Sequence, residues 1–434
     1  MNKWVELDAS FGWTVVSEFS ESDHYGWVLE LVSQRWVGPE FTDRPIWKHW
    51  LTITVPQSVD TTTAFLHIGG GSIHDLPPAG PTERFLSLAL RTRSVVVELW
   101  QVPNQPARFV AKPQTLHSED SFVAFLLSQF DGNLETLPRF PMVKSAVAAM
   151  TATQQCLERF SDARVLARRF VVTGSSKRGW AAWLVGLMDH RVIGIVPVVI
   201  NILNVSASVR HHWQTLGFFP KALQPYIDES VIPHGIGGSA LEAANAIEDP
   251  FSYVHSERMR IPKLIIVSSG DEYFPADSTR LYFSDLPSPK HLRVLPNAGH
   301  SPVGTDVNDT IASWYRALSH DQSLPDCEFS YPGDGRIALC SGDEPVAVTL
   351  WLATNPDARD FRLSAIGGEG FTESEVLPNA SGQYCIFVPT PSDGFVAYLM
   401  EVQFELQTGE TFKLTSELRV VPDLMPFDWP KSTT

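Results

Sequence analysis

The chain has 434 residues, of which 44% are hydrophobic and 19% are charged. This composition is typical of folded globular proteins, and the length favours two or three domains with a large buried core. The formal net charge of −16 at pH 7 disfavours nucleic acid or an anionic membrane surface as a partner. No apolar run is long enough to span a membrane, and the first residues lack the apolar segment of a signal peptide. The sequence as it stands therefore predicts a cytoplasmic protein, unless a leader is missing from it.

The four cysteines are too few for a disulfide-stabilised fold, and none of them forms a C-x-x-C pair. Cys156 lies in a segment of helical composition and is expected to be a buried thiol. Cys327, Cys340 and Cys385 lie in the C-terminal part, where they leave room for one disulfide in an oxidising compartment.

In chain order, the first strands are predicted at residues 25–36, 46–56, 63–68 and 94–100. The first two lie close together and predict an antiparallel start to a sheet. Strands and helices alternate after them, which predicts an α/β fold with a mostly parallel sheet and helices on both faces.

A glycine run, Gly69, Gly70 and Gly71, follows the third of these strands. Such a loop can turn backbone N–H groups toward a developing oxyanion, as in the HGGG-type loops of esterases. Three glycines are also typical of a flexible turn, so the run alone leaves both interpretations open. The sequence contains no G-x-x-x-x-G-K-[ST] motif, and a phosphate loop of that type is not indicated.

The most informative stretch begins with an amphipathic helix at residues 142–160 and a β-branched strand at residues 170–173. The strand meets a turn from Gly174 to Ser176, and a segment of helical composition starts directly afterwards. Gly174-x-Ser176 is the first half of a nucleophile elbow, in which a strained turn holds a serine hydroxyl above the sheet edge. A serine before a helix is also an ordinary N-cap, so the elbow is one of two interpretations.

Arg178 departs from the elbow pattern, which has a small residue at that position, and the glycine comes one place later at Gly179. A salt bridge that ties the helix to the sheet would explain Arg178 structurally. Alternatively, Arg178 is a fixed cation near the pocket that favours an acidic or carboxylate-bearing substrate.

A further apolar run at residues 192–200 predicts the next buried parallel strand. Residues 201–260 differ in composition and are rich in His, Trp, Phe and Pro. An insertion after a strand of a parallel sheet lies over the carboxyl ends of the strands, so this segment is predicted to be a lid that shapes the substrate pocket. The adjacent His211 and His212 would point in different directions on a helix, and no metal site or other cofactor is predicted.

Polar residues follow the next two predicted strands, at residues 263–269 and 291–295. Asp271 comes after the first strand and His300 after the second. Together with Ser176 they occur in the chain order of an α/β-hydrolase triad, in which serine attacks, histidine carries the proton and aspartate holds the imidazolium. Asp271 is preferred because it directly follows a strand-ending glycine. The competing carboxylates in the same loop are Glu272 and Asp277.

An oxyanion formed on the substrate would need hydrogen-bond donors beside Ser176. The predicted donors are the amide of Lys177, the residue after the nucleophile, and an amide from Gly70 or Gly71.

The segments IWKHWLTITVP, ELWQVPNQP, TGSSKRGWAAW, SSGDEYF with NAGHS, and LWLATNPDARDFR resemble the PhoPQ-activated pathogenicity-related proteins, which also include secreted proliferation repressors. The resemblance covers nearly the whole chain, and SKRGW is its most specific part. It implies an α/β-hydrolase fold, with the family's serine, aspartate and histidine at Ser176, Asp271 and His300. Because members are commonly exported, it also implies a secreted or periplasmic protein.

The chain departs from this family at two positions, since Asn201 stands where aspartate is expected and Ser175 where alanine is usual. The first departure bears on any substrate contact made by that loop. The candidate substrate contacts are Arg178, Asn201, His211 and Trp213.

The composition changes again after a final helix at residues 308–319, with Pro and Gly separating short runs. This change predicts a hydrolase domain at residues 1–321 and an all-β, immunoglobulin-like sandwich at residues 322–434. The strands predicted in the second domain are 346–352, 361–364, 384–388, 395–406 and 412–421. The domain has no catalytic set of residues, and structural cover for the first domain is preferred over carbohydrate or protein binding.

The sequence as a whole predicts a metal-independent serine hydrolase that forms an acyl-enzyme on Ser176 and cleaves an ester of a small or medium substrate. A serine exopeptidase is the first alternative, because the same triad also cleaves amides. The second alternative is a secreted signalling or binding protein that keeps the fold with an idle triad. The substrate is therefore expected to be a small molecule or a peptide, and the oligomeric state is left open.

Overall fold

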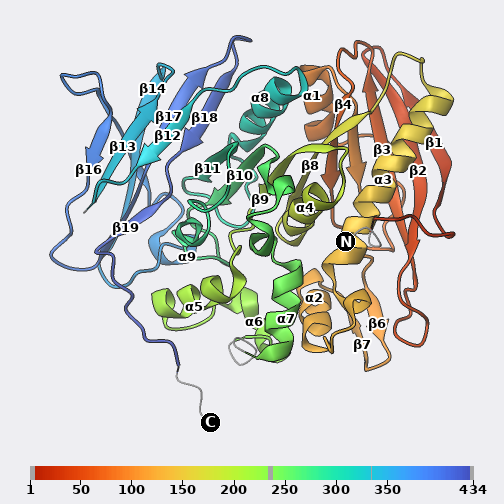
Figure 1. The fold of residues 1–434 in the computed structure, drawn as a ribbon, viewed down its shortest axis with the longest axis horizontal. Helices are drawn as coiled ribbons and strands as arrows, with labels where there is room; N and C mark the ends of the chain where they lie inside the picture. Colours follow the sequence, from red (N-terminus) through yellow and green to blue (C-terminus); the bar gives the residue numbers. More distant parts are fainter. Residues whose placement is uncertain (1–4, 233–237, 334, 431–434) are drawn as a thin grey trace.

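The computed structural model describes residues 5–232, 238–333 and 335–430. A nine-stranded sheet runs through the molecule, with helices packed against it and two smaller sheets at one side (Figure 1). Its strand order is β1-β2-β3-β5-β4-β8-β9-β10-β11. The bounds of the strands are β1 Gly12–Ser20, β2 His24–Arg35, β3 Ile46–Pro56, β4 Thr63–Ile68, β5 Val96–Leu99, β8 Arg169–Ser175, β9 Val192–Val198, β10 Lys263–Ser268 and β11 Lys290–Leu295.

The sheet is mixed. Neighbouring strands are parallel from β5 through β4, β8, β9 and β10 to β11. β1, β2 and β3 pair in antiparallel fashion with each other, and β3 pairs in the same way with β5. This edge contains the antiparallel start that the sequence predicts, extended by β1, which the sequence analysis does not identify. The parallel strands place their carboxyl ends at one edge of the sheet, where ligand sites of such folds form.

Different helices pack against the two faces of the sheet. Val171 of β8 belongs to a core shared with α1 and α8, whereas its neighbours Phe170 and Val172 belong to a core shared with α3 and α4. This alternation follows from the strand geometry, because successive side chains point to opposite faces. The helices are α1 Glu83–Thr92, α3 Arg139–Phe160, α4 Lys177–Met188 and α8 Val307–Ser319.

The segment predicted as a lid is largely helical, and it packs near α2 (Glu119–Ser128) and the hairpin of β6 (Ala107–Phe109) and β7 (Lys112–Leu116) in the lower part of Figure 1. Residues 233–237 of the segment lie outside the described residues. Its helices and 3-10 turns are α5 Val205–Leu216, Lys221–Leu223, α6 Gln224–Asp228, α7 Ser239–Glu248, Pro250–Tyr253 and Glu257–Arg260.

The C-terminal part forms two antiparallel sheets. One has the order β12-β13-β16, and the other has the order β15-β14-β17-β18, with β19 also paired to β17. The strands are β12 Cys327–Ser330, β13 Arg336–Ser341, β14 Ala347–Asn355, β15 Thr372–Glu375, β16 Cys385–Phe387, β17 Phe395–Glu405, β18 Thr411–Thr415 and β19 Arg419–Val421. The immunoglobulin-like classification of this part stays a prediction.

β17 connects this part to the main sheet. Tyr398 and Met400 lie in the core between the two C-terminal sheets, whereas Ala397 and Leu399 lie in the core beneath the main sheet. Since alternate side chains of one strand enter two cores, the C-terminal part is packed against the rest of the molecule along a strand face.

Two predicted strands of the C-terminal part differ from the structure. The sequence predicts a strand at residues 361–364, whereas Leu363–Ile366 is a short helix, α9. The Leu363 N–H donates to the Gly270 carbonyl oxygen at 3.1 Å, so contact with the main sheet overrides the local strand preference. Residues 412–421 form two strands, β18 and β19, because the chain leaves the sheet edge between them. The strands β12, β13 and β15 are not predicted from the sequence.

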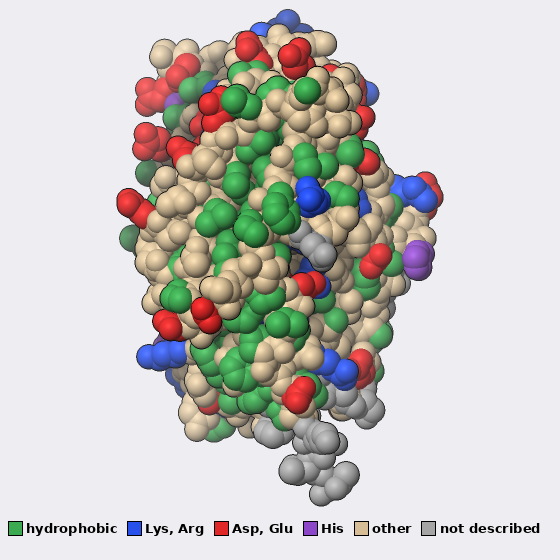
Figure 2. Space-filling model, turned by 90° about the vertical axis from the view of Figure 1, so that its left-hand side faces the viewer, with side chains coloured by type: hydrophobic (Ala, Val, Ile, Leu, Met, Phe, Trp, Pro, Cys, Tyr) green, Lys and Arg blue, Asp and Glu red, His purple; other side chains and the backbone are tan. Residues whose placement is uncertain are grey.

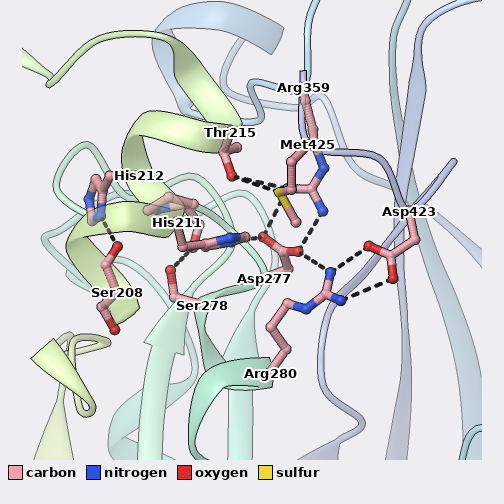
Figure 3. A network of polar contacts seen from close by, with 11 residues as sticks. Ser208, His211, His212, Thr215, Asp277, Ser278, Arg280, Arg359, Asp423 and Met425 are labelled. Atoms are coloured by element: carbon pink, nitrogen blue, oxygen red, sulfur yellow. Dashed lines mark hydrogen bonds and ion pairs between the residues drawn. The ribbon is translucent and has the colours of Figure 1, made fainter. Parts of the chain in front are cut away.

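A buried network of ion pairs ties the C-terminal part to the insertion (Figure 3). Arg359, which is 2% exposed, donates to Asp277 at 2.6 Å, and His211 of α5 lies 2.8 Å from the same carboxylate. Arg280 joins Asp277 to Asp423 near the end of the chain. Burial would raise the pKa of Asp277, but His211 and Arg359 hold it well below its ordinary value.

The outer face of the C-terminal part carries scattered hydrophobic side chains, with acidic side chains toward its rim (Figure 2). Val346, Leu377 and Phe387 are among the exposed hydrophobic residues of this part. All four cysteines are free thiols, so the disulfide that the sequence left room for is not formed. Within the described ranges, the helices are all too short or too polar to traverse a bilayer.

Removing Arg359 is expected to destabilise the protein strongly. Arg359→Ala leaves the buried Asp277 carboxylate without its closest cation, which costs about 3 kcal/mol of unfolding free energy. The control is Arg164→Ala, because that guanidinium pairs with Asp162 in full solvent and should leave stability unchanged. Denaturant unfolding measures both, and equal stabilities of the two variants would contradict the role given to Arg359.

Candidate active site

Ser176 occupies a strained turn between β8 and α4. Its φ is 56° and its ψ is −126°, a combination that non-glycine residues rarely adopt. Ser176 stands at the N-cap position of α4, but its side chain makes no capping hydrogen bond and its dihedral angles are not those of an ordinary N-cap. The geometry therefore favours the nucleophile-elbow interpretation over the N-cap interpretation.

Close backbone packing around this turn explains its glycines. A Cβ at Gly174 would lie 2.5 Å from the carbonyl oxygen of Arg178, and one at Gly179 would lie 2.8 Å from the carbonyl oxygen of Gly174. The strand and the helix thus touch at Gly174 and Gly179, and the small residue of the pattern is needed at position 179. Arg178 is tolerated because its side chain leaves this contact and extends toward Glu119, 2.8 Å away.

The structure brings the side chains of Ser176, His300 and Asp271 together. The Ser176 Oγ lies 2.9 Å from the His300 Nε2. The His300 Nδ1 lies 2.9 Å from Oδ2 and 3.1 Å from Oδ1 of Asp271. The three residues come from the loops after β8, β10 and β11, so the parallel strands deliver them to one edge of the sheet. In this arrangement the histidine can accept the serine proton while the carboxylate orients its ring.

Asp271 is nearly inaccessible, at 2% exposure, and its Oδ1 also accepts the Tyr273 N–H at 2.8 Å. Burial raises the pKa of Asp271, and the hydrogen bond from His300 opposes that shift. The two competing carboxylates have other partners. Glu272 accepts the backbone N–H of His300 at 2.9 Å, and Asp277 belongs to the buried ion-pair network.

Tyr273 lies directly beside His300 and is not among the residues predicted from the sequence. Its ring stacks beside the His300 ring with the centroids 4.2 Å apart, and its hydroxyl donates to Asp120 at 3.2 Å. Asp120 in turn forms a 2.7 Å ion pair with Lys177. Tyr273 follows Asp271 by two residues, but sequence spacing alone could not reveal its contact with α2.

The C-terminal part supports the two loops that carry Asp271 and His300. The side-chain amide of Asn297 donates to the Phe371 carbonyl oxygen and accepts the Phe371 N–H, both at 2.8 Å. On the other loop, a Cβ at Gly270 would lie 2.5 Å from the Leu363 side chain, so glycine permits this close approach. The C-terminal part thus contacts both of these loops.

Two cavities meet at Ser176. We name the first the inner chamber, which has about 80 Å³ of free space and is walled mainly by the insertion. Its lining includes Ser176, Lys177, Trp180, Ile202, Val205, Val209, Leu223, Ile232 and Leu241. The second, the outer cavity, has about 570 Å³. Its lining includes Arg84, Glu119, Asp120, Ser176, Lys177, Arg178, Tyr273, His300, Ser301, Val303 and Gly304.

Arg178 forms a salt bridge with Glu119 of α2, not with the sheet as expected, and it also lines the outer cavity. Its role toward a substrate stays a prediction. Its guanidinium group lies against the glycine loop after β4, where a Cβ at Gly70 would be 2.4 Å from Nη1. Among the described residues that line the two cavities, neither Gly70 nor Gly71 appears.

The other candidate substrate contacts have partners elsewhere. The Asn201 side chain accepts a hydrogen bond from the Tyr282 hydroxyl at 2.8 Å. His211 faces Asp277, and the Trp213 ring N–H donates to the carbonyl oxygen of Asp428 at 2.9 Å. None of these three residues is among the described residues lining either cavity. The histidine that does line the inner chamber is His212. In the part of the chain that the structure describes, no cluster of His, Cys, Asp and Glu is arranged to hold a metal ion.

The mixed sheet, the strained serine turn and the strand-end histidine and aspartate define the α/β-hydrolase fold. An acetyl xylan esterase from a Thermoanaerobacterium species has the same fold, with a TM-score of 0.51, 15% identity, and coverage of 73% of this chain and 92% of that chain. An acetyl xylan esterase from a Paenibacillus species aligns with a TM-score of 0.47 and 12% identity over 73% of this chain and 90% of its own.

The chain belongs to the PhoPQ-activated pathogenicity-related protein family, which matches residues 1–362. It is also 34% identical to autocrine proliferation repressor protein A of Dictyostelium discoideum, over 97% of this chain and 90% of that protein. The family resemblance seen in the sequence is therefore confirmed.

The elbow packing generates a prediction for Gly174→Ala. Because the added methyl group would lie 2.5 Å from a backbone oxygen, the first turn of α4 has to shift, at a cost of about 1–3 kcal/mol. Ser176 moves with that turn and loses its hydrogen bond to His300. The control is Gly12→Ala, where the methyl group meets no atom within 4 Å. Gly174→Ala should be less stable in denaturant unfolding than Gly12→Ala, and a probe that reacts with Ser176 should label it less. Equal stability and equal labelling of the two variants would contradict the packing argument.

Proposed function

We propose that the protein is a serine hydrolase that forms an acyl-enzyme on Ser176 and acts on an ester of a small or medium substrate. The observation that carries the proposal is the hydrogen-bonded order of Ser176 Oγ, His300 and Asp271, at 2.9 Å for each link. The strained backbone at Ser176 supports it, because such strain is found where a side chain has to be held for function.

The chemistry follows from the roles of these groups. His300 Nε2 takes the Ser176 proton as the oxygen attacks the ester carbonyl, and Asp271 stabilises the imidazolium that forms. The amide of Lys177, the first of α4, has no acceptor within the helix and is a donor for the oxyanion. The second donor is assigned to Gly70 or Gly71. His300 then protonates the leaving oxygen, and water releases the acyl group by the same steps in reverse.

The roles of the two larger segments belong to the same proposal. Residues 201–260 serve as the lid, because their side chains supply most of the wall of the inner chamber. Residues 322–434 serve as a support, because Arg359, Leu363 and Phe371 contact the insertion or the site loops. Export from the cytoplasm is proposed from the family, whose members are commonly secreted or periplasmic.

A second candidate function is a secreted signalling protein with an idle triad. What favours it is the relative of 34% identity, which is named as an autocrine proliferation repressor. The two candidates differ in whether Ser176 reacts, so one experiment separates them.

A fluorophosphonate probe should label the protein on Ser176, because the probe reacts only with an activated serine. Ser176→Ala should abolish the label, and peptide mapping of the labelled protein should locate it. The control is Ser175→Ala, which removes a neighbouring hydroxyl outside the hydrogen-bonded set. No labelling of the wild-type protein would favour the signalling candidate over the hydrolase.

The ester preference is measured by comparing para-nitrophenyl esters with aminoacyl and dipeptidyl anilides. Faster cleavage of the anilides would identify a serine exopeptidase instead of an esterase.

The reaction rate is expected to rise with pH between about pH 5 and about pH 8. His300 has to be neutral to accept the serine proton, and Asp271 has to be charged to stabilise the imidazolium. Burial raises the pKa of Asp271, so acidification removes its charge more readily than that of an exposed carboxylate, and the rate falls in acid. kcat/KM measured across this range checks the prediction, and Asp271→Asn should lose about a thousandfold or more in kcat. A flat profile would contradict the role of His300.

A further inference from the structure

The outer cavity has one cation more than its carboxylates neutralise. Lys177 pairs with Asp120 at 2.7 Å, and Arg178 pairs with Glu119 at 2.8 Å. The remaining cation that lines the cavity is Arg84, in the first turn of α1. Among the residues that the structure describes, no carboxylate lies within ion-pair distance of Arg84.

The surroundings of Arg84 leave its charge available to a ligand. The carboxylate that influences it most is Glu98, whose oxygens accept the backbone N–H and the hydroxyl of Thr82 at 3.0 and 2.8 Å. Burial raises the pKa of Glu98 to about 7, so this group carries only part of a charge at neutral pH. Arg84 and Arg178 both line the outer cavity, together with Ser176 and His300.

The position of His300 decides which part of an ester lies in each cavity. Its Nε2 has to deliver a proton to the leaving oxygen, so the leaving group lies on the His300 side of Ser176. His300 and the residues that follow it line the outer cavity, whereas the described lining of the inner chamber does not include them. The alcohol part of the ester therefore lies in the outer cavity and the acyl part lies in the inner chamber.

The inner chamber restricts the acyl part to short apolar groups. Its wall is formed by side chains such as Ile202, Val205, Leu223 and Leu241, and its free space is about 80 Å³. Arg139, which lines the chamber, is already paired with the buried Glu248 at 2.9 Å. An acyl chain gains hydrophobic contact with these aliphatic side chains.

Resting on the proposed hydrolase function, we propose that the substrate is an ester of a short apolar acid with an alcohol that carries an anionic group. Arg84 binds the anion, a carboxylate or a phosphate, in the outer cavity. In the reaction the bond from Ser176 Oγ to the acyl carbon forms as the ester C–O bond breaks. The proton taken by His300 passes to the leaving oxygen, so the products are the acyl-enzyme and the free anionic alcohol.

The test compares three butanoyl esters that differ only at the far end of the leaving group. They are para-butanoyloxybenzoate, para-butanoyloxyphenyl phosphate and the neutral para-butanoyloxybenzamide. The wild-type protein should show a higher kcat/KM for at least one anionic ester than for the neutral one, and the better anion identifies carboxylate or phosphate. Equal kcat/KM values for all three esters would overturn the proposal while leaving the hydrolase function intact.

Variants of Arg84 test whether this residue causes the preference for anionic esters. Arg84→Gln should lower the ratio of anionic to neutral kcat/KM about tenfold, because one charge-assisted contact is lost. Arg84→Lys keeps the charge and should retain part of the ratio, which guards against a loss caused by misfolding. The matched control is Arg91→Gln, which removes the same charge from the last turn of the same helix, outside the outer cavity. An unchanged ratio in Arg84→Gln would overturn the assignment.

A second readout does not need turnover. Para-hydroxybenzoate or para-hydroxyphenyl phosphate should slow fluorophosphonate labelling of Ser176 more than para-hydroxybenzamide does, and Arg84→Gln should remove this difference. If Ser176 is labelled but the anionic and neutral compounds protect it equally, the anion site is contradicted and the hydrolase function is not. Absence of labelling contradicts the hydrolase function, and the anion site with it.

Discussion

Asp277 is the buried carboxylate at which the two parts of the molecule meet. It lies 2% exposed between Arg359 of the C-terminal part and His211 of the insertion, and Arg280 is its third charged partner. Such a group is stable in the interior only with its partners, because an unpaired buried charge is costly. The paired amide of Asn297 with Phe371 adds a second junction beside the loop of His300. The relative positions of sheet, insertion and site loops depend on these contacts.

The packing around Ser176 offsets the backbone strain at this residue. Its φ of 56° costs about 1–3 kcal/mol, and the contacts around it fix the turn. Gly174 and Gly179 let the strand and the helix touch, and the Ser176 N–H donates to the Val198 carbonyl oxygen at 2.8 Å. Packing of the sheet thus stabilises a backbone conformation that the local sequence alone would not adopt. The serine hydroxyl is held 2.9 Å from His300 as a result.

The sequence predicts the elements whose signals are local. The apolar runs mark the parallel strands, and the residues that follow them, Ser176, Asp271 and His300, come together because parallel strands end at one edge. The features that the sequence does not predict depend on contacts between residues that are far apart in the chain. The 361–364 segment is helical because it docks on Gly270, and Arg84 reaches the outer cavity from a helix with no motif. His211 pairs with the buried carboxylate of Asp277, and the spacing of the two residues in the sequence does not predict this contact.

The support given by the C-terminal strands has a consequence for biosynthesis. A ribosome makes Ser176, Asp271 and His300 well before it makes Arg359, Phe371 and Asp423. The nascent chain therefore contains these three side chains while the contacts from the C-terminal part to their loops are still missing. The packing around the loops of Asp271 and His300 is therefore completed only after Arg359 and Phe371 have been synthesised.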